Sequence, residues 1–332
     1  MSPRVKKSLA MICCACLLLV VGCSSPVSPP TAVSETTSAS AATTPTATKA
    51  AQPEPTPTKQ PEPRRVGANV AYSPESPLPR LDVYLPATGD GPFPTILAIH
   101  GGGFYTGDKS GYSRLAAHFA NLGYAFVPIN YRLAPTYTYP AQVEDVFCAL
   151  SWVHANHSTY DLDNEHVFVM GESAGGYLAA MLGTVDTPGD YLQNCPNALP
   201  QSDWIQGVVV FYGFYDFTSI DGYPPGDRDK LERYWGAEFS EIAPATLAEM
   251  SPVSWVDGNE PPFLLIHGTL DTSVPSWMSE DFAAALEGVG VQTQLLILGG
   301  ADHAFTLGLW SSPHNTQSRE AMEAFLSALS EQ

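Results

Sequence analysis

The stretch Val167-Phe168-Val169-Met170-Gly171-Glu172-Ser173-Ala174-Gly175-Gly176 decides the fold class of this chain. Its first four residues form a continuous apolar run, which predicts a strand that is buried on both faces of a sheet. The small residues that follow allow a tight turn into a predicted helix over 174–182. A Gly-x-Ser-x-Gly turn between a strand and a helix leaves the serine hydroxyl, here that of Ser173, exposed at the helix N-terminus.

Other segments repeat this alternation of strand and helix. Residues 80–86 alternate apolar and polar side chains, which predicts an early strand with one solvated face. The later apolar runs are continuous, and buried strands that alternate with helices form parallel sheets covered on both faces. We therefore predict an α/β fold with a mostly parallel sheet. Its later strands are predicted over 95–100, 124–129, 207–212, 262–267 and 293–298, and its other helices over 111–122, 142–156 and 317–330.

Residues 213–256 interrupt the alternation. They contain Tyr223-Pro224-Pro225-Gly226 and scattered aromatic side chains. We interpret the segment as an insertion over the carboxyl end of the sheet that forms a small lid. The alternative for a segment of this length is a surface loop that takes no part in binding.

A serine hydroxyl is a weak nucleophile without a base, so Ser173 needs a histidine and an acid that orients the histidine. His303 follows the last predicted strand, and its loop reaches the carboxyl end of the sheet, so we predict that it is the base. Asp271 follows the predicted strand 262–267 and is the predicted acid. The competing Asp302 adjoins His303 in sequence and is interpreted as a turn residue.

The stretch His100-Gly101-Gly102-Gly103-Phe104 follows another buried strand. Consecutive glycines let backbone N–H groups point into a site without obstruction by a Cβ atom. We predict an oxyanion hole formed by the N–H groups of Gly102, Gly103 and Ala174. His100 and His267 end buried strands, and we interpret them as structural residues of their loops. This chemistry requires no cofactor and no metal ion, and we expect none.

The N-terminus has the pattern of a targeting segment. Basic residues precede an apolar run over 9–21, which is shorter than the roughly 20 residues of a membrane-spanning helix. The run ends at Val20-Val21-Gly22-Cys23, which resembles the bacterial lipobox. The resemblance implies a signal peptide over 1–22, a lipid on Cys23, and an exported lipoprotein anchored to a membrane at the cell surface or in the periplasm. An ordinary signal peptide is the alternative.

Residues 23–65 are rich in Ser, Thr, Ala and Pro, as in Gln52-Pro53-Glu54-Pro55-Thr56-Pro57. This composition predicts a disordered tether. The catalytic domain then covers 66–332, a length that suits one large α/β domain. The net charge of −19 argues against binding to nucleic acid or to an anionic membrane surface. The lipid anchor is therefore the only membrane contact that we expect.

Two pairs of residues have structural interpretations. Cys148 and Cys195 are the only cysteines of the predicted domain, and they can form a disulfide in an oxidising compartment. Two separate buried thiols are the alternative. Arg132 and Asp145 are interpreted as a structural ion pair or loop anchor.

The chain carries four further-reaching motifs, which are His100-Gly101-Gly102-Gly103, Tyr131-Arg132-Leu133-Ala134-Pro135, Gly171-Glu172-Ser173-Ala174-Gly175-Gly176 and Asp302-His303-Ala304-Phe305. Together they resemble the motifs of the bacterial carboxylesterases of the α/β-hydrolase fold, in the hormone-sensitive-lipase-like branch. The short N-terminal region with Leu81-Asp82-Val83-Tyr84-Leu85-Pro86 and the stretch Phe104-Tyr105-Thr106-Gly107-Asp108-Lys109 resemble the acetylxylan and feruloyl esterase-like subgroup. The likeness covers roughly residues 70–330.

The resemblance implies hydrolysis of small acyl or aryl-acyl esters, with esters of plant polysaccharides as one class of substrate. We predict that Ser173 forms an acyl-enzyme in this reaction. Phe104, Tyr105 and Trp277 are candidate pocket residues, with core or rim packing as an equal alternative. An amide hydrolase of the peptidase or arylformamidase type is a second hypothesis for function, and a non-catalytic surface binding protein is a third.

Overall fold

The computed structural model describes residues 62–74, 77–199, 205–218, 223, 225–307 and 310–331. The predicted signal peptide, Cys23 and the predicted tether up to residue 61 lie outside these residues. Strand β1 begins at Arg64, two residues before the predicted start of the domain. The described residues belong to a single structural unit. Within them, no helix is long and apolar enough to cross a membrane.

The described residues contain an eight-stranded sheet with the strand order β1-β2-β4-β3-β5-β6-β7-β8. Strand β2 pairs antiparallel with β1 and β4, and the remaining neighbours pair parallel. The predicted mostly parallel sheet is thus confirmed. The strands are β1 (Arg64–Ala71), β2 (Arg80–Leu85), β3 (Phe93–Ile99), β4 (Ala125–Asn130), β5 (Leu162–Glu172), β6 (Gly207–Phe211), β7 (Phe263–Gly268) and β8 (Thr293–Leu298).

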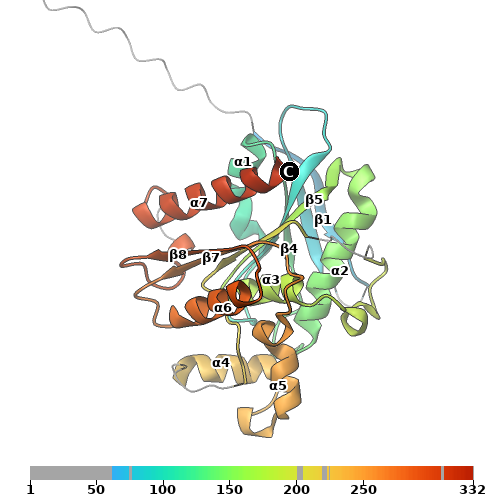
Figure 1. Ribbon diagram of the computed structural model, residues 1–332. Helices are drawn as coiled ribbons and strands as arrows, with labels where there is room; N and C mark the ends of the chain where they lie inside the picture. The colour runs from blue at the N-terminus through green and yellow to red at the C-terminus, as the bar shows by residue number, and fades with distance from the viewer. Residues whose placement is uncertain are drawn as a thin grey trace, which may run out of the picture. The chain divides into compact units, whose positions relative to one another are not determined.

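Helices cover both faces of the sheet, as Figure 1 shows. In β3, Ile96 and Ala98 belong to the apolar cluster with α1 and α7, whereas Leu97 and Ile99 belong to the cluster with α2, α3 and α6. Successive strand residues face opposite sides, so a continuous apolar run fills both layers. The helices are α1 (Ser113–Asn121), α2 (Ala141–Asn156), α3 (Ala174–Thr184), α6 (Trp277–Gly288) and α7 (Pro313–Ser330).

The predicted lid segment contains two further helices, α4 (Pro225–Trp235) and α5 (Pro244–Met250), which lie below the layers in Figure 1. The ring of Tyr234 in α4 stacks on Phe104, with ring centroids 3.9 Å apart. Leu231 in the same helix is buried. Because Phe104 follows β3 at the carboxyl end of the sheet, α4 is held against the end predicted to carry the site.

Both structural pairs predicted from the sequence are in contact. Cys148 in α2 and Cys195 form a disulfide, with Cα atoms 5.1 Å apart. Asp145 accepts a hydrogen bond from the backbone N–H of Arg132 at 2.7 Å and from its Nε at 2.9 Å. Glu144 accepts another from Nη2 of Arg132 at 2.8 Å. These contacts tie the loop after β4 to the start of α2.

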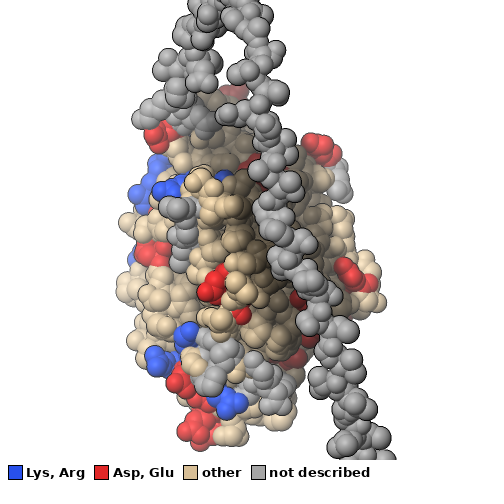
Figure 2. Space-filling view, turned by 90° about the vertical axis from the view of Figure 1, so that its left-hand side faces the viewer, with Lys and Arg blue, Asp and Glu red and all other residues tan. Residues whose placement is uncertain are grey.

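The described surface carries dispersed charge. Basic side chains on the face in Figure 2 form two separated groups, each with acidic side chains beside it. No single basic patch covers that described face, which agrees with the acidic composition of the chain.

Candidate active site

Ser173 occupies the tight turn between β5 and α3. Its backbone φ of 54° and ψ of −119° are uncommon for a residue with a side chain. A Cβ atom on Gly171 would lie 2.0 Å from the carbonyl oxygen of Gly175, and one on Gly175 would lie 2.1 Å from that of Ile99. The backbone N–H of Ser173 donates to the carbonyl of Phe211 at 2.9 Å. The turn therefore requires its flanking glycines.

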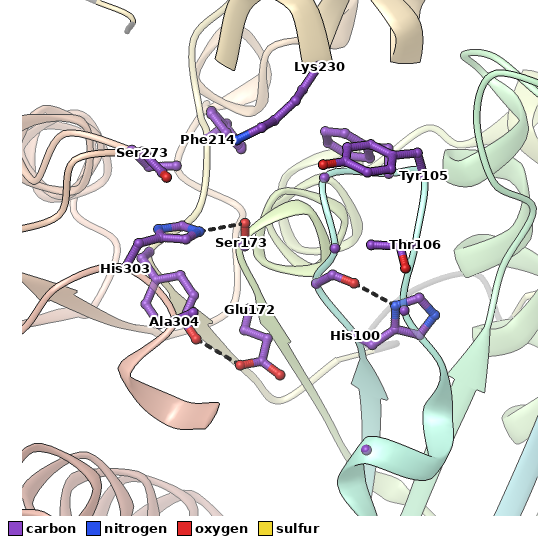
Figure 3. Close-up of a pocket in the computed structure, with 18 of the residues that line it drawn as sticks. His100, Tyr105, Thr106, Glu172, Ser173, Phe214, Lys230, Ser273, His303 and Ala304 are labelled. Atoms are coloured by element: carbon purple, nitrogen blue, oxygen red, sulfur yellow. Dashed lines mark hydrogen bonds between the residues drawn. The ribbon is translucent and has the colours of Figure 1, made fainter. Parts of the chain in front are cut away.

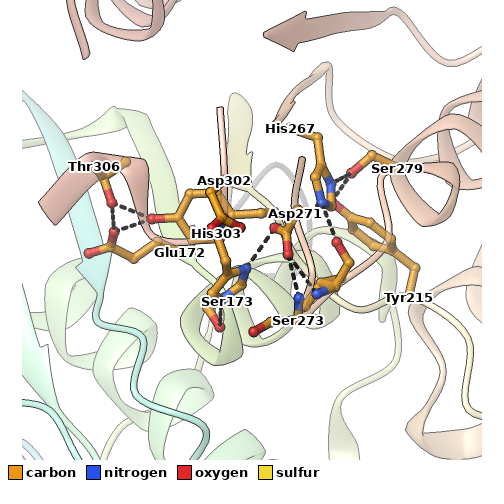
Figure 4. A network of polar contacts seen from close by, with 12 residues as sticks. Glu172, Ser173, Tyr215, His267, Asp271, Ser273, Ser279, Asp302, His303 and Thr306 are labelled. Atoms are coloured by element: carbon orange, nitrogen blue, oxygen red, sulfur yellow. Dashed lines mark hydrogen bonds and ion pairs between the residues drawn. The ribbon is translucent and has the colours of Figure 1, made fainter. Parts of the chain in front are cut away.

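Three side chains from separate loops form a hydrogen-bonded line in Figure 4. Nε2 of His303 lies 3.0 Å from Oγ of Ser173. Nδ1 of the same ring lies 2.7 Å from Oδ2 of Asp271. The structure thus brings together the three residues that the sequence predicts as nucleophile, base and acid. Asp302 is not part of the line, and its Oδ1 accepts the backbone N–H of His303 at 2.7 Å.

The carboxylate of Asp271 is buried and fully hydrogen-bonded. Its Oδ1 accepts the backbone N–H groups of Ser273 at 2.9 Å and Val274 at 2.7 Å. Oδ2 also lies 3.3 Å from Nε2 of His267. Burial acts to raise the pKa of Asp271, but the hydrogen bonds from His267 and His303 outweigh it and hold the pKa below its ordinary value. An ionised Asp271 can fix the tautomer of His303 and stabilise its protonated form.

The glycine loop after β3 lies next to Ser173. Gly102 and Gly103 have φ of 121° and 61°, and a Cβ atom on Gly102 would lie 2.1 Å from the carbonyl oxygen of Thr106. Among the described residues, neither glycine N–H donates to a backbone carbonyl. Ala174 is the first residue of α3, where an N–H has no acceptor within the helix. These N–H groups can stabilise an oxyanion next to Ser173.

His100 has a structural environment at the start of this loop. Its ring stacks on Tyr131 with centroids 4.5 Å apart, and Nδ1 lies 2.7 Å from the carbonyl oxygen of Gly101. Burial lowers the pKa of His100, which favours the neutral ring. His267 is likewise buried, with Nδ1 2.7 Å from Oγ of Ser279. Both histidines hold loops that border the site.

Ser173 and His303 open into a cavity of about 460 Å³, shown in Figure 3. Phe104 and Tyr105, predicted as pocket residues, both line it, together with Phe214. The ring of Phe104 is almost fully buried, whereas Tyr105 is 39% exposed. Among the described residues, no group of three or more His, Cys, Asp and Glu side chains is placed to hold a metal ion.

Trp277 does not line this cavity, so its prediction as a pocket residue is wrong. It is the first residue of α6 and is 40% exposed. Met278, Phe282 and Leu286, at four-residue spacing, are buried, as are Ser279 and Ala283 beside them. The face of α6 that packs on the sheet therefore leaves Trp277 at the surface.

The structure adds functional candidates that the sequence does not predict. Oε2 of the buried Glu172 accepts hydrogen bonds from Oγ1 of Thr306 and from the hydroxyl of Tyr212, the latter at 2.8 Å. The ring of Tyr212 lies edge-on to His303 with centroids 4.7 Å apart. Lys230 of α4 lines the cavity. Only the position of Glu172 inside the serine motif could have drawn attention to this group.

Residues 81–286, more than half of the chain, match the protein-family model described as BD-FAE. This chain belongs to the BD-FAE family. A probable carboxylic ester hydrolase of Mycobacterium tuberculosis, LipM, is 34% identical over 71% of the chain and 54% of its own length. Esterase LipC of the same organism is 34% identical over 65% of the chain and 54% of its own length. The chain thus spans about half the length of these curated relatives.

Solved esterase structures share the fold. A truncated carbohydrate esterase from gut microbiota aligns with a TM-score of 0.66 and 22% identity, over 83% of the chain and 99% of that structure. Esterase B from Lactobacillus rhamnosis aligns with a TM-score of 0.68 and 23% identity. The alignment covers 80% of this chain and 85% of that structure. With the family match, they confirm the predicted α/β-hydrolase fold and the resemblance to bacterial carboxylesterases of the hormone-sensitive-lipase-like branch.

Proposed function

We propose that this BD-FAE chain is a serine carboxylesterase with Ser173 as its nucleophile. The observation that carries the proposal is the line from Asp271 through His303 to Ser173, with contacts of 2.7 and 3.0 Å, at the edge of a cavity. A nucleophile, a base and an acid in hydrogen-bond reach are the parts of acyl transfer. The esterases and ester hydrolases among its relatives support the same reaction class.

The proposed reaction proceeds in two steps. Oγ of Ser173 attacks the ester carbonyl carbon while Nε2 of His303 takes the hydroxyl proton, and the N–H groups of Gly102, Gly103 and Ala174 stabilise the oxyanion. The C–O bond to the alcohol then breaks, and the alcohol leaves with the proton from His303. Water, deprotonated by His303, releases the acid and restores the free serine.

For the substrate, we propose small acyl esters, with acetyl or feruloyl esters of plant polysaccharides as the class. A cavity of about 460 Å³ with Phe104, Tyr105 and Phe214 in its wall can accept an acetyl or an aryl-acyl group. The similarity to a structure described as a carbohydrate esterase also supports this class.

The test compares the full-length chain with Ser173→Ala on p-nitrophenyl acetate, p-nitrophenyl butyrate, acetylated xylan and methyl ferulate. Turnover of the p-nitrophenyl esters that Ser173→Ala abolishes supports the serine esterase. Release of acetate or ferulate supports the polysaccharide class. A folded wild-type protein that cleaves none of these esters overturns the proposal.

We further propose that the chain is exported and anchored by a lipid on Cys23, on the basis of Val20-Val21-Gly22-Cys23 after an apolar run. Expression in a bacterium with isotope-labelled palmitate should label the wild-type protein and place it in the detergent phase after partition. Cys23→Ala should abolish both results. Wild-type protein that stays unlabelled in the aqueous phase would contradict this proposal.

A further inference from the structure

A buried ion pair joins β2 to the loop that follows β3. Nζ of Lys109, at the end of this loop, lies 3.2 Å from Oδ1 of Asp82 in β2. Both side chains are buried, although neither belongs to the proposed triad. Two charges removed from water are stable together only when further hydrogen bonds satisfy each of them. The partners of the pair therefore decide how firmly it holds the loop.

Hydrogen bonds satisfy both members of the pair. Oδ2 of Asp82 lies 2.6 Å from Nη2 of Arg65, and its Oδ1 accepts the backbone N–H of Asn69 at 2.8 Å. The Lys109 ammonium also donates to Oδ1 of Asn69 at 2.7 Å. Burial acts to raise the pKa of Asp82, but the hydrogen bonds from its three partners outweigh it and lower the pKa below its ordinary value. Strands β1 and β2 thus together hold Lys109.

The main chain next to Lys109 is held by β4. The backbone N–H of Lys109 donates to Oδ1 of Asn130, the last residue of β4, at 2.6 Å. Nδ2 of Asn130 in turn donates to Oδ2 of Asp108 at 2.7 Å. The other oxygen of Asp108 accepts the backbone N–H of Ser110 at 2.8 Å. The end of the loop is therefore fixed to the sheet through both its backbone and its side chains.

The loop runs outward over 100–103 and comes back over 104–109, the return arm, which packs directly on the glycines. The backbone N–H of Thr106 donates to the carbonyl of Gly102 at 3.1 Å. A Cβ atom on Gly107 would lie 2.3 Å from Nδ1 of His100. Figure 3 shows Thr106 and His100 on the same side of Ser173. Because the two arms are in contact, a shift of the return arm moves the glycine N–H groups as well.

We propose that Lys109 positions the oxyanion hole through its buried pair with Asp82. The pair holds the return arm, and the return arm holds the N–H groups of Gly102 and Gly103 where a developing oxyanion needs them. Lys109 does not line the cavity, so it acts through the loop. This inference rests on the proposed esterase function and adds a positioning residue to it.

The experiment compares the full-length chain with Lys109→Met, which removes the charge and retains an unbranched side chain. Asp82 keeps its bonds from Arg65 and from the Asn69 N–H, so its carboxylate is not left without a partner. We expect kcat on p-nitrophenyl butyrate to fall by about tenfold with KM changed by less than about twofold. A donor that shifts loses part of the roughly hundredfold that a missing oxyanion donor costs.

Arg65→Gln is the matched control. It removes a charge from the same cluster, but Arg65 contacts Asp82 and the ring of Tyr84, which both lie outside the loop. Its kcat should stay within about twofold of the wild type. Urea unfolding of each variant reports the loss of stability separately from the loss of activity.

A pair of inhibitors separates the oxyanion hole from the rest of the cavity. Oγ of Ser173 adds to the carbonyl carbon of 1,1,1-trifluoro-2-octanone, its proton goes to His303, and the carbonyl oxygen becomes an oxyanion. The matching alcohol, 1,1,1-trifluoro-2-octanol, forms no such adduct. Lys109→Met should raise the inhibition constant of the ketone by about tenfold and leave that of the alcohol within about twofold. The ratio of the two constants does not depend on the fraction of folded enzyme.

Asn69→Gly provides a second variant if Lys109→Met does not fold. Asn69 has a φ of 52°, which glycine adopts readily, and the change removes one acceptor of the Lys109 ammonium. It should lower kcat and weaken the ketone by about threefold, again without an effect on the alcohol.

An unchanged kcat and an unchanged ratio of inhibition constants in the folded variant would overturn the role of Lys109 and leave the esterase function standing. An equal loss of kcat in Arg65→Gln would also overturn it, because the loss would then follow the stability of the cluster. A wild-type protein that cleaves no ester overturns the esterase function, and the positioning role with it.

Discussion

Oγ1 of Thr306 donates a hydrogen bond to Oε2 of Glu172, the residue directly before Ser173. Thr306 lies three residues after His303, so this bond joins the loop of the proposed base to the turn of the proposed nucleophile. Tyr212 donates to the same carboxylate oxygen at 2.8 Å and packs its ring edge-on against His303. The three residues, Glu172, Tyr212 and Thr306, therefore position His303 relative to Ser173.

Thr306→Val removes the donor from this group and retains the shape of the side chain. We expect kcat to fall by about tenfold with KM changed by less than about twofold, because a buried hydrogen bond to a carboxylate contributes roughly 1.5–3 kcal/mol. Steady-state kinetics on p-nitrophenyl butyrate measures both constants. Thr306→Ser should recover most of the activity. Equal kcat for the wild type and the valine variant would show that Thr306 does not position His303.

Tyr105 and Trp277 form a matched pair of exposed aromatic residues, one inside and one outside the cavity wall. Tyr105→Ala should raise KM for aryl esters, because it removes apolar wall from the cavity. Trp277→Ala should leave kcat/KM unchanged within about twofold. Kinetics on methyl ferulate and p-nitrophenyl butyrate tests both. A larger loss from Trp277→Ala than from Tyr105→Ala would contradict the assignment of the cavity.

The lowered pKa of Asp271 links the free energy of unfolding to pH. The folded state holds the carboxylate ionised at a pH where the unfolded chain, with an ordinary pKa near about 3.9, already binds a proton. The stabilisation is therefore complete above about pH 5 and is lost as the pH falls through the folded pKa. Relative to Asp271→Asn, the wild type should gain unfolding free energy between about pH 3 and pH 5 in urea titrations and no more above that range. A pH-independent difference would contradict the hydrogen bonding described for Asp271.

The disulfide between Cys148 and Cys195 closes a loop with a sequence separation of 47 residues. Removing such a cross-link costs about 2–4 kcal/mol of unfolding free energy. The double variant Cys148→Ala/Cys195→Ala, and reduced wild type, should unfold at lower urea concentrations than the oxidised protein. Because neither cysteine lines the cavity, kcat/KM of the folded variant should stay within about twofold. Identical urea midpoints for oxidised and reduced wild type would contradict the prediction.

Much of the sheet and of the serine turn could be predicted because each depends on local patterns. Continuous apolar runs identified β3 to β8. Ser173, Asp271 and His303 each follow one of these strands, and parallel strands end at the same edge of a sheet, so the three residues were expected at one edge. Such positions follow from topology alone.

Features that depend on contacts between distant segments could not be predicted in this way. Glu172 and Thr306 are separated by 134 positions, and no local pattern indicates that they meet. The apolar residues at four-residue spacing in α6 do predict a helix, and they would have shown Trp277 at its exposed side. The conformation of α4 depends on the stacking of Tyr234 on Phe104, which only the fold reveals.

The most direct test of the proposed function is covalent labelling of the full-length chain with diethyl p-nitrophenyl phosphate, followed by peptide mass spectrometry. The hydrogen-bonded line from Asp271 to Ser173 predicts one diethylphosphoryl group on Ser173, release of one equivalent of p-nitrophenol, and loss of esterase activity in step with labelling. His303→Ala should slow the labelling, and Ser173→Ala should abolish it. Unlabelled Ser173 in a protein that still cleaves esters, or labelling of another serine that accounts for the lost activity, would contradict the account.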